Sequence, residues 1–456
     1  MGMGRKLAVL AGAGIAATAA SAQPPQKVTG PVAVYWMSAA TQSGFGMPGG
    51  GAGGGRPSMS SIMQMMNGGG GANHSLTLQL GSSEKPTAAP SAEHLPPQVL
   101  GVGPTLPLVS PEPPKVVAPE PEEPREPPVP REYQQPKGKM LIFWGCGEHA
   151  KPGQPVVIDF SQMTPANMAG GKMPAGFEML SKGFAMNRMQ PPSARRYTSY
   201  GEWPNAQART TVPGTGSLIG GHTIRGDYSP EIKFSLNENQ DFLGPLVLTT
   251  NTKTPGGPAQ LGWGPVSGAR AYAAIVIGAS GAGGRGGGGG DPTVVLWSSS
   301  ETGGGGFALP DYLSPGDLAR GVETRALMGP EITSCAVPKE VVDAAPQGFL
   351  QMVAYGQEAN FVYPERPKDP KIPWNRQWEV KVRYRSATGG LLGMTMPSMG
   401  GRAAAAGRGG YPGQAPPGAT TDGQQAQAPP AQQTPQDAAA ARRRAILQGI
   451  GGLIPH

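Results

Sequence analysis

The sequence predicts a mainly β protein, built as one or two antiparallel β-sandwich modules with long Gly/Pro-rich disordered segments and a short C-terminal helix. The 456 residues include 72 glycines and 52 prolines. Inside a helix, each glycine destabilises the helix by about 1 kcal/mol and each proline by about 3 kcal/mol relative to alanine, so a mainly helical chain is excluded. The ordered stretches that remain are short apolar or alternating runs separated by turn residues, which is typical of sandwiches and barrels.

Nine runs between residues 139 and 386 have the composition or alternation of β-strands. They are residues 139–144, 155–160, 231–236, 245–250, 259–264, 270–278, 292–298, 347–355 and 376–386. Two earlier runs, 31–37 and 74–80, can pair with each other across the segment between them. Short helical pieces are expected at 315–328 and 338–345.

Changes in composition divide the chain into seven parts. These are a signal peptide (1–22), a small β segment (23–110) with a Gly/Met-rich flexible insertion (44–73), a Pro/Glu-rich linker (111–137), a β-rich region (138–243), a β-sandwich (244–396), a Gly/Ala/Gln/Pro-rich linker (397–433) and an amphipathic helix (434–456).

The first 22 residues have the three parts of a signal peptide. Basic Arg5 and Lys6 precede a short apolar stretch that ends in small residues at Ala20 and Ala22. We therefore expect cleavage near Ala22 and a bacterial protein that is periplasmic, on the cell surface or secreted. The net charge of +7 falls to +5 (35 − 30) without the signal peptide. Such a mild excess, with no basic stripe interleaved with aromatic residues, argues against nucleic-acid binding.

A segment in the predicted sandwich resembles the fibronectin type III family. Trp263 is followed by Pro265-Val266-Ser-Gly268-Ala269 and then by Tyr272 with the apolar residues Ile275 and Ile277. In that family a core tryptophan, such a turn and such a tyrosine strand recur in this order. The resemblance covers residues 244–386 and implies a binding or spacer role without an active site. Independently, Trp263, Tyr272, Ile275 and Ile277 can fill one face of two paired strands.

Cys146 and Cys335 are the two cysteines of the chain. In an exported protein a disulfide between them is favoured, and two separate buried thiols are the alternative. Cys146 also lies close to Glu148 and His149, a set that could bind zinc or form an activated nucleophile. The Cys-x-x-Cys spacing of structural zinc sites is absent, so a disulfide beside an exposed turn is the preferred interpretation.

A second candidate for chemistry is the segment from His222 to Glu231. Carboxylates of Asp227 and Glu231 near an imidazole are suited to general acid–base catalysis on a sugar or peptide bond. Asp227 lies in Gly-Asp-Tyr-Ser-Pro, however, which is also good turn chemistry. Four methionines near His74 could bind copper, but they form no regular array; they are Met59, Met63, Met65 and Met66. We expect no cofactor.

The end of the chain combines a basic start with an apolar stripe at helical spacing. The residues are Arg442, Arg443, Arg444, Ile446, Leu447 and Ile450. Such a helix is suited to peripheral contact with an anionic membrane or to a partner, and folding back onto its own sandwich is the alternative.

Together these features predict an exported cell-envelope protein of binding or structural type. Its β-sandwich surfaces would be presented on flexible tethers to an envelope protein or a surface glycan. The alternative is a secreted hydrolase of polysaccharide or peptide that uses the His222 to Glu231 region. These two hypotheses differ in whether the carboxylates converge with the histidine in a pocket. Ligand identity and oligomeric state stay open.

Overall fold

The computed structural model describes residues 26–44, 72–86, 90–111, 137–163, 176–178, 190–208, 210–281, 291–303 and 309–394. The expected signal peptide, the linker 397–433 and the C-terminal helix 434–456 lie outside these residues. So do most of the insertion 44–73 and most of the linker 111–137, together with the four methionines of the copper hypothesis and the basic and apolar residues of the C-terminal helix.

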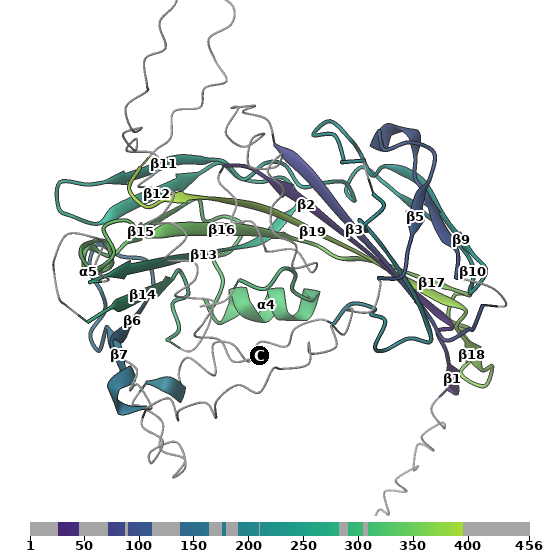
Figure 1. Ribbon diagram of the computed structural model, residues 1–456, viewed down its shortest axis with the longest axis horizontal. Coiled ribbons are helices and arrows are strands. Elements are labelled where there is room, and N and C mark those ends of the chain that lie inside the picture. The colour runs from purple at the N-terminus through teal and green to yellow at the C-terminus, as the bar shows by residue number, and fades with distance from the viewer. Residues whose placement is uncertain are drawn as a thin grey trace, which may run out of the picture.

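The described part of the chain is mainly β, as the sequence predicts (Figure 1). The strands are β1 (Val28–Thr29), β2 (Ala33–Gln42), β3 (Asn73–Ser82), β4 (Ala92–Leu95), β5 (Leu106–Leu108), β6 (Lys139–Trp144), β7 (Val156–Asp159), β8 (Ser199–Trp203), β9 (Gly220–Gly226), β10 (Ser229–Leu236), β11 (Leu248–Lys253), β12 (Ala259–Trp263), β13 (Ala269–Ser280), β14 (Thr293–Ser298), β15 (Ser334–Val337), β16 (Phe349–Gly356), β17 (Ala359–Tyr363), β18 (Trp374–Asn375) and β19 (Trp378–Leu391). The two α-helices are α4 (Pro315–Glu323) and α5 (Lys339–Ala344).

A ten-stranded sheet forms the centre of the molecule. Its strand order is β7-β6-β14-β13-β16-β19-β2-β3-β8, and β17 pairs with β19 beyond the end of β16. Strands β6 and β14 are parallel, as are β2 and β19. The sheet is therefore mixed, which differs from the antiparallel modules expected. In both parallel pairs the strands are far apart in the sequence, so no hairpin sets their relative direction.

Strands β2 and β3 pair as the sequence predicts. They are antiparallel over ten residues each, from Ala33 opposite Ser82 to Gln42 opposite Asn73. Tyr35 and Met37 of β2 are fully buried on one face, and Leu78 of β3 lies directly opposite Met37. This alternation directs one set of side chains to the core and the other to the opposite face of the sheet.

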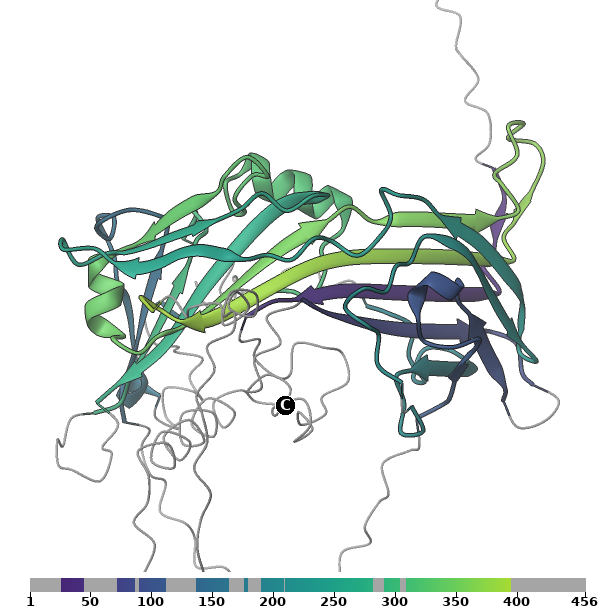
Figure 2. The same cartoon turned by 90° about the horizontal axis from the view of Figure 1, so that it is seen from above.

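Two smaller sheets cover the same face of the central sheet. The sheet β10-β9-β4-β5 lies at one end and the sheet β11-β12-β15 at the other (Figure 1). Side chains of all three sheets join in one hydrophobic core, which includes Leu80, Phe234 and Trp263. Figure 2 shows the long strands β2 (purple) and β19 (yellow-green) running side by side in the same direction, as their parallel pairing requires.

The other face of the central sheet is partly covered by α4. Ser314 caps this helix by accepting a hydrogen bond from the backbone N–H of Asp317, and Pro315 occupies its first turn, where the missing N–H is tolerated. The buried Leu318 packs with Ala273 and Val353 of the sheet. The rest of this face carries the polar side chains considered below.

The segments separated by composition do not correspond to separate sheets. The central sheet takes β2 and β3 from 23–110, β6, β7 and β8 from 138–243, and β13, β14, β16, β17 and β19 from 244–396. Trp263 and Tyr272, expected on two paired strands, lie instead on strands of different sheets, with their ring centroids 5.6 Å apart. Ile277 pairs with Leu296 on the face of β13 opposite Tyr272.

A disulfide joins Cys146 and Cys335. Cys146 follows β6 of the central sheet, and Cys335 lies in β15 of a smaller sheet. The backbone N–H of Gly147 donates to the carbonyl oxygen of Ala336 at 2.9 Å beside the bridge. The disulfide therefore ties two sheets together across 189 residues of sequence.

Candidate binding site

The structure separates the residues of the predicted hydrolase site. His222 is 1% exposed and faces the core from β9. Glu231 lies on the outer face of β10, where it pairs with Arg225 and Lys233 and its pKa is lowered by those hydrogen bonds. Asp227 accepts a hydrogen bond from the backbone N–H of Ser91 at 3.0 Å. The carboxylates and the imidazole therefore do not converge on a common cleft.

The second candidate for chemistry is also altered by the fold. Because Cys146 is oxidised to a disulfide, its sulfur is neither a thiolate ligand nor a nucleophile. His149 is exposed, and its Nδ1 lies 3.0 Å from the Glu340 carboxylate. Glu148 contributes its backbone carbonyl oxygen to the N–H of Lys339 at 2.9 Å. This turn therefore serves to connect β6 with the start of α5.

His222 takes part in a buried hydrogen-bonded chain that sequence reasoning missed. Its Nε2 lies 2.7 Å from the carbonyl oxygen of Leu218, which can only accept, so Nε2 carries the proton. Its Nδ1 therefore accepts from Nε2–H of His94 at 3.0 Å. The Nδ1 of His94 then accepts from the hydroxyl of Tyr35. Both imidazoles are therefore neutral, and each of the three hydrogen bonds from Tyr35 to Leu218 contains one proton.

Burial sets the ionisation of these groups. It lowers the pKa of His222 to about 4, although the hydrogen bond to Leu218 opposes the shift. It also lowers the pKa of His94 well below its usual range, with a smaller contribution from His222. The phenol of Tyr35 has its pKa raised by burial. This buried series of hydrogen bonds stabilises the core and is not exposed to a ligand.

A polar surface lies on the opposite face of the central sheet. Register places Asn360 of β17, Lys381 of β19 and Trp36 of β2 side by side. In the neighbouring row Val362 lies beside Glu379. The alternation of β19 produces this surface because its even-numbered side chains from Trp378 to Tyr384 enter the core while the odd-numbered ones face outward.

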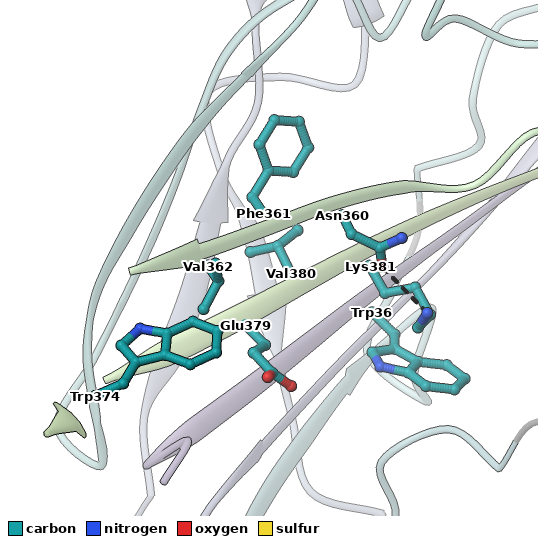
Figure 3. A pocket seen from close by; sticks show the side chains of 8 residues that line it. All are labelled: Trp36, Asn360, Phe361, Val362, Trp374, Glu379, Val380 and Lys381. Carbon is teal, nitrogen blue, oxygen red and sulfur yellow. Dashed lines mark hydrogen bonds between the residues drawn. The ribbon is translucent and has the colours of Figure 1, made fainter. Parts of the chain in front are cut away.

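A cleft of about 280 Å³ opens on this surface (Figure 3). Its lining residues come from β2, β17, β18 and β19, and they are Trp36, Asn360, Phe361, Val362, Trp374, Glu379, Val380 and Lys381. In Figure 3 the Trp374 ring lies at one end, the Trp36 ring lies near Lys381 at the other, and the Glu379 carboxylate lies between them. Clefts that combine aromatic walls with a few polar groups are typical of ligand sites. We call this the Trp374 cleft.

The charged groups of the Trp374 cleft are paired within the protein. Lys381 donates to the Glu358 carboxylate and, at 3.1 Å, to Oδ1 of Asn360. Arg376 donates to Oε1 of Glu379. The side chain of Glu358 is 4% exposed, so its ion pair with Lys381 is shielded from water. Each charge that lines the cleft therefore has an opposite charge beside it.

Stacked cations support both tryptophans. The guanidinium of Arg383 lies 4.3 Å from the ring centroid of Trp36 and 4.3 Å from that of Tyr312. It also donates to the hydroxyl of Ser38 at 2.6 Å. Burial lowers the pKa of Arg383, and the ring contacts partly replace its lost hydration. Trp36 is only 9% exposed.

Trp374 is held at its edge and above its ring. Its indole N–H donates to the carbonyl oxygen of Pro364 at 2.9 Å. The guanidinium groups of Arg366 and Arg376 lie 5.6 and 5.4 Å from the ring centroid. The ring orientation is therefore determined before any ligand arrives.

Within the described ranges, no group of three or more His, Cys, Asp or Glu side chains is arranged to hold a metal ion. In the same part of the chain, none of the helices has both the length and the apolar character required to cross a bilayer. Comparison of the chain with protein-family models, curated proteins and solved structures finds no match. The resemblance to fibronectin type III modules stays a prediction.

Proposed function

We propose that this is an exported cell-envelope protein that acts by binding, with the Trp374 cleft as its ligand site. The observation that carries the proposal is the meeting of two tryptophans with an ammonium, a carboxylate and an amide in one cleft on a broad sheet. The partner is an envelope component, either a surface glycan or an envelope protein.

The proposal treats the body as two β-sandwiches that share one long sheet. The two smaller sheets support this interpretation, since each packs on the same face of the central sheet at a different end. The Gly/Pro-rich segments are then tethers that let the cleft search a wide volume. The hydrolase alternative loses its support, because His222 points into the core while Glu231 points outward.

Export and binding are tested on the native protein. Mass spectrometry of the mature N-terminus after envelope fractionation should give Gln23 as the first residue. Affinity capture from solubilised envelope should retain a ligand on the wild-type chain and lose it with Trp374→Ala. The matched control is Trp144→Ala, since Trp144 is also partly exposed but lies on β6, a strand distant from β19 in the sheet order. Equal capture by the Trp374→Ala variant would remove the cleft from the proposal, and a protein that stays in the cytoplasm would remove export.

A further inference from the structure

We infer that the Trp374 cleft recognises an uncharged pyranose residue of a glycan. The inference rests on the proposed binding function and specifies its ligand class. Its basis is the juxtaposition of internally neutralised charges, unused hydrogen-bonding capacity and an indole whose polar atom is already occupied.

The charged side chains that line the Trp374 cleft are already paired within the protein. A site for an ionic ligand keeps an uncompensated charge to pair with it, because an ion that loses water needs a counter-charge. Here Lys381 is neutralised by Glu358, and Glu379 is neutralised by Arg376. The lining side chains carry one positive and one negative charge, so their sum is zero. An ionic ligand that bound to Lys381 or Glu379 would therefore have to compete with one of these ion pairs.

The polar side chains of the cleft keep hydrogen-bonding groups that the protein does not use. The ammonium of Lys381 has three donors, and Glu358 and Asn360 take two of them. The amide of Asn360 uses one N–H on Glu358 at 2.8 Å and has a second. Oε1 of Glu379 accepts from Arg376, and Oε2 has no partner among the residues that the structure describes. Two donors and one acceptor are therefore left without a partner among the described residues, and vicinal hydroxyl groups can satisfy both kinds because each hydroxyl donates and accepts.

The aromatic walls of the cleft offer a ligand an apolar surface. Since the N–H of Trp374 already donates to Pro364, this indole offers a ligand only the ring surface that Arg366 and Arg376 leave uncovered. The faces of an aromatic ring are electron-rich, and the C–H groups on one side of a pyranose pack against such a surface. Val362 extends the apolar wall beside Glu379. An apolar wall next to a row of polar groups matches the two-sided character of a sugar ring.

An extended peptide is the competing occupant, because β17 pairs only with β19 among the described strands and its other edge could accept a strand. Main-chain pairing at that edge would not require the polar row of the cleft. The lining groups favour the saccharide, so a peptide ligand is one of the outcomes that the test distinguishes.

The test measures binding of defined oligosaccharides to the full mature chain by calorimetry and by saturation-transfer NMR. The neutral probes are maltohexaose, cellohexaose and chitohexaose, at concentrations up to about 10 mM, which covers weak single-site binding. The charged probes are galacturonic acid oligomers and glucosamine oligomers of similar length. At least one neutral probe should bind saturably and more tightly than either charged probe.

The variants locate the binding. Trp374→Ala should weaken it about 10-fold, equivalent to about 1.4 kcal/mol, while Trp144→Ala leaves it unchanged. Asn360→Ala should weaken binding about 5-fold through the loss of one hydrogen bond. Asn360 is exposed, so this second variant should fold even if Trp374→Ala does not. Trp374→Phe, which keeps a ring, should restore most of the affinity.

Three results would overturn the saccharide assignment. They are no binding of any neutral probe, tighter binding of a charged probe, and capture of a polypeptide as the ligand that Trp374→Ala loses. In each of these cases the proposed binding function survives if Trp374→Ala still abolishes capture from the envelope. If capture is unchanged by Trp374→Ala, the cleft is not the binding site and both proposals fail.

Discussion

Lowering the pH from 7 to 5 should destabilise the protein through its buried histidine pair. His94 and His222 are hydrogen-bonded as neutral rings, with one proton in each gap between Tyr35 and Leu218. A further proton on either imidazole would put two N–H or O–H donors opposite each other in one of these hydrogen bonds. The folded state therefore resists protonation, whereas the histidines of the unfolded chain bind protons freely.

The magnitude follows from the pKa of His222, which burial lowers from 6.5 to about 4. Since the folded-state pKa lies below the unfolded value, the unfolded state binds more protons between these values, and stability present above pH 6.5 is lost as the pH falls. His222 alone then lowers the free energy of unfolding by about 2 kcal/mol at pH 5 and by about 3 kcal/mol at pH 4. The lowered pKa of His94 acts with the same sign.

The assay is urea unfolding at pH 7 and pH 5, followed by tryptophan fluorescence with the disulfide intact. Stopping at pH 5 avoids most protonation of carboxylates, whose ordinary pKa values lie near 4. In His222→Gln the difference between the two pH values should shrink by about 2 kcal/mol. His149→Gln is the matched control, because His149 is an exposed histidine paired with Glu340. Equal stability of the wild-type protein at both pH values, or an unchanged difference in His222→Gln, would refute the reasoning.

Three further predictions concern stability. Replacing Cys146 and Cys335 together by alanine should lower the free energy of unfolding by up to about 5 kcal/mol, because the bridge closes a loop of 189 residues. A reducing agent should destabilise the wild-type protein and have no effect on the double variant. If the reducing agent also destabilised the double variant, its effect would not come from this disulfide. Gly278→Ala should lower the free energy of unfolding, measured by chemical denaturation, by about 1–3 kcal/mol, because the new Cβ would lie 2.4 Å from the Cβ of Ala345, which follows α5. A Cβ added at Gly264 would meet nothing within 4 Å, so Gly264→Ala should leave the stability nearly unchanged. Arg383→Lys should cost about 1–2 kcal/mol, because an ammonium cannot stack on an indole and a phenol ring as a guanidinium does; an unchanged unfolding midpoint would show that the stack contributes nothing.

Strand positions followed from local pattern where that pattern was strong. The alternation in 376–386 predicted most of β19, and the structure extends it to Leu391, where the strand pairs with β16. Strand β9 was missed because Gly-Gly-His-Thr-Ile-Arg-Gly has glycines at both ends and little apolar content. It forms a strand because β4 and β10 pair with it on its two sides.

The candidate site shows the same limit. The sequence displays the alternating charges of 378–385, which was the available signal, but not their neighbours. Trp36, Lys381 and Asn360 become adjacent only through the parallel pairing of β2 with β19 and the antiparallel pairing of β17 with β19. His222 was assigned to a hydrolase site because Glu231 is close in the sequence, whereas adjacent strands turned the two side chains to opposite faces.

By itself, the sequence determined the β character of the chain, the pairing of 31–37 with 74–80, and the side chains that alternate on each strand. These properties depend on local composition and a two-residue period. Only the tertiary structure decided that three composition segments share one sheet, that His222 meets His94 in the core, and that Trp374 and Trp36 line one cleft. The physical reason is that pairing between distant strands is set by how their apolar faces pack together, and no single segment contains that information.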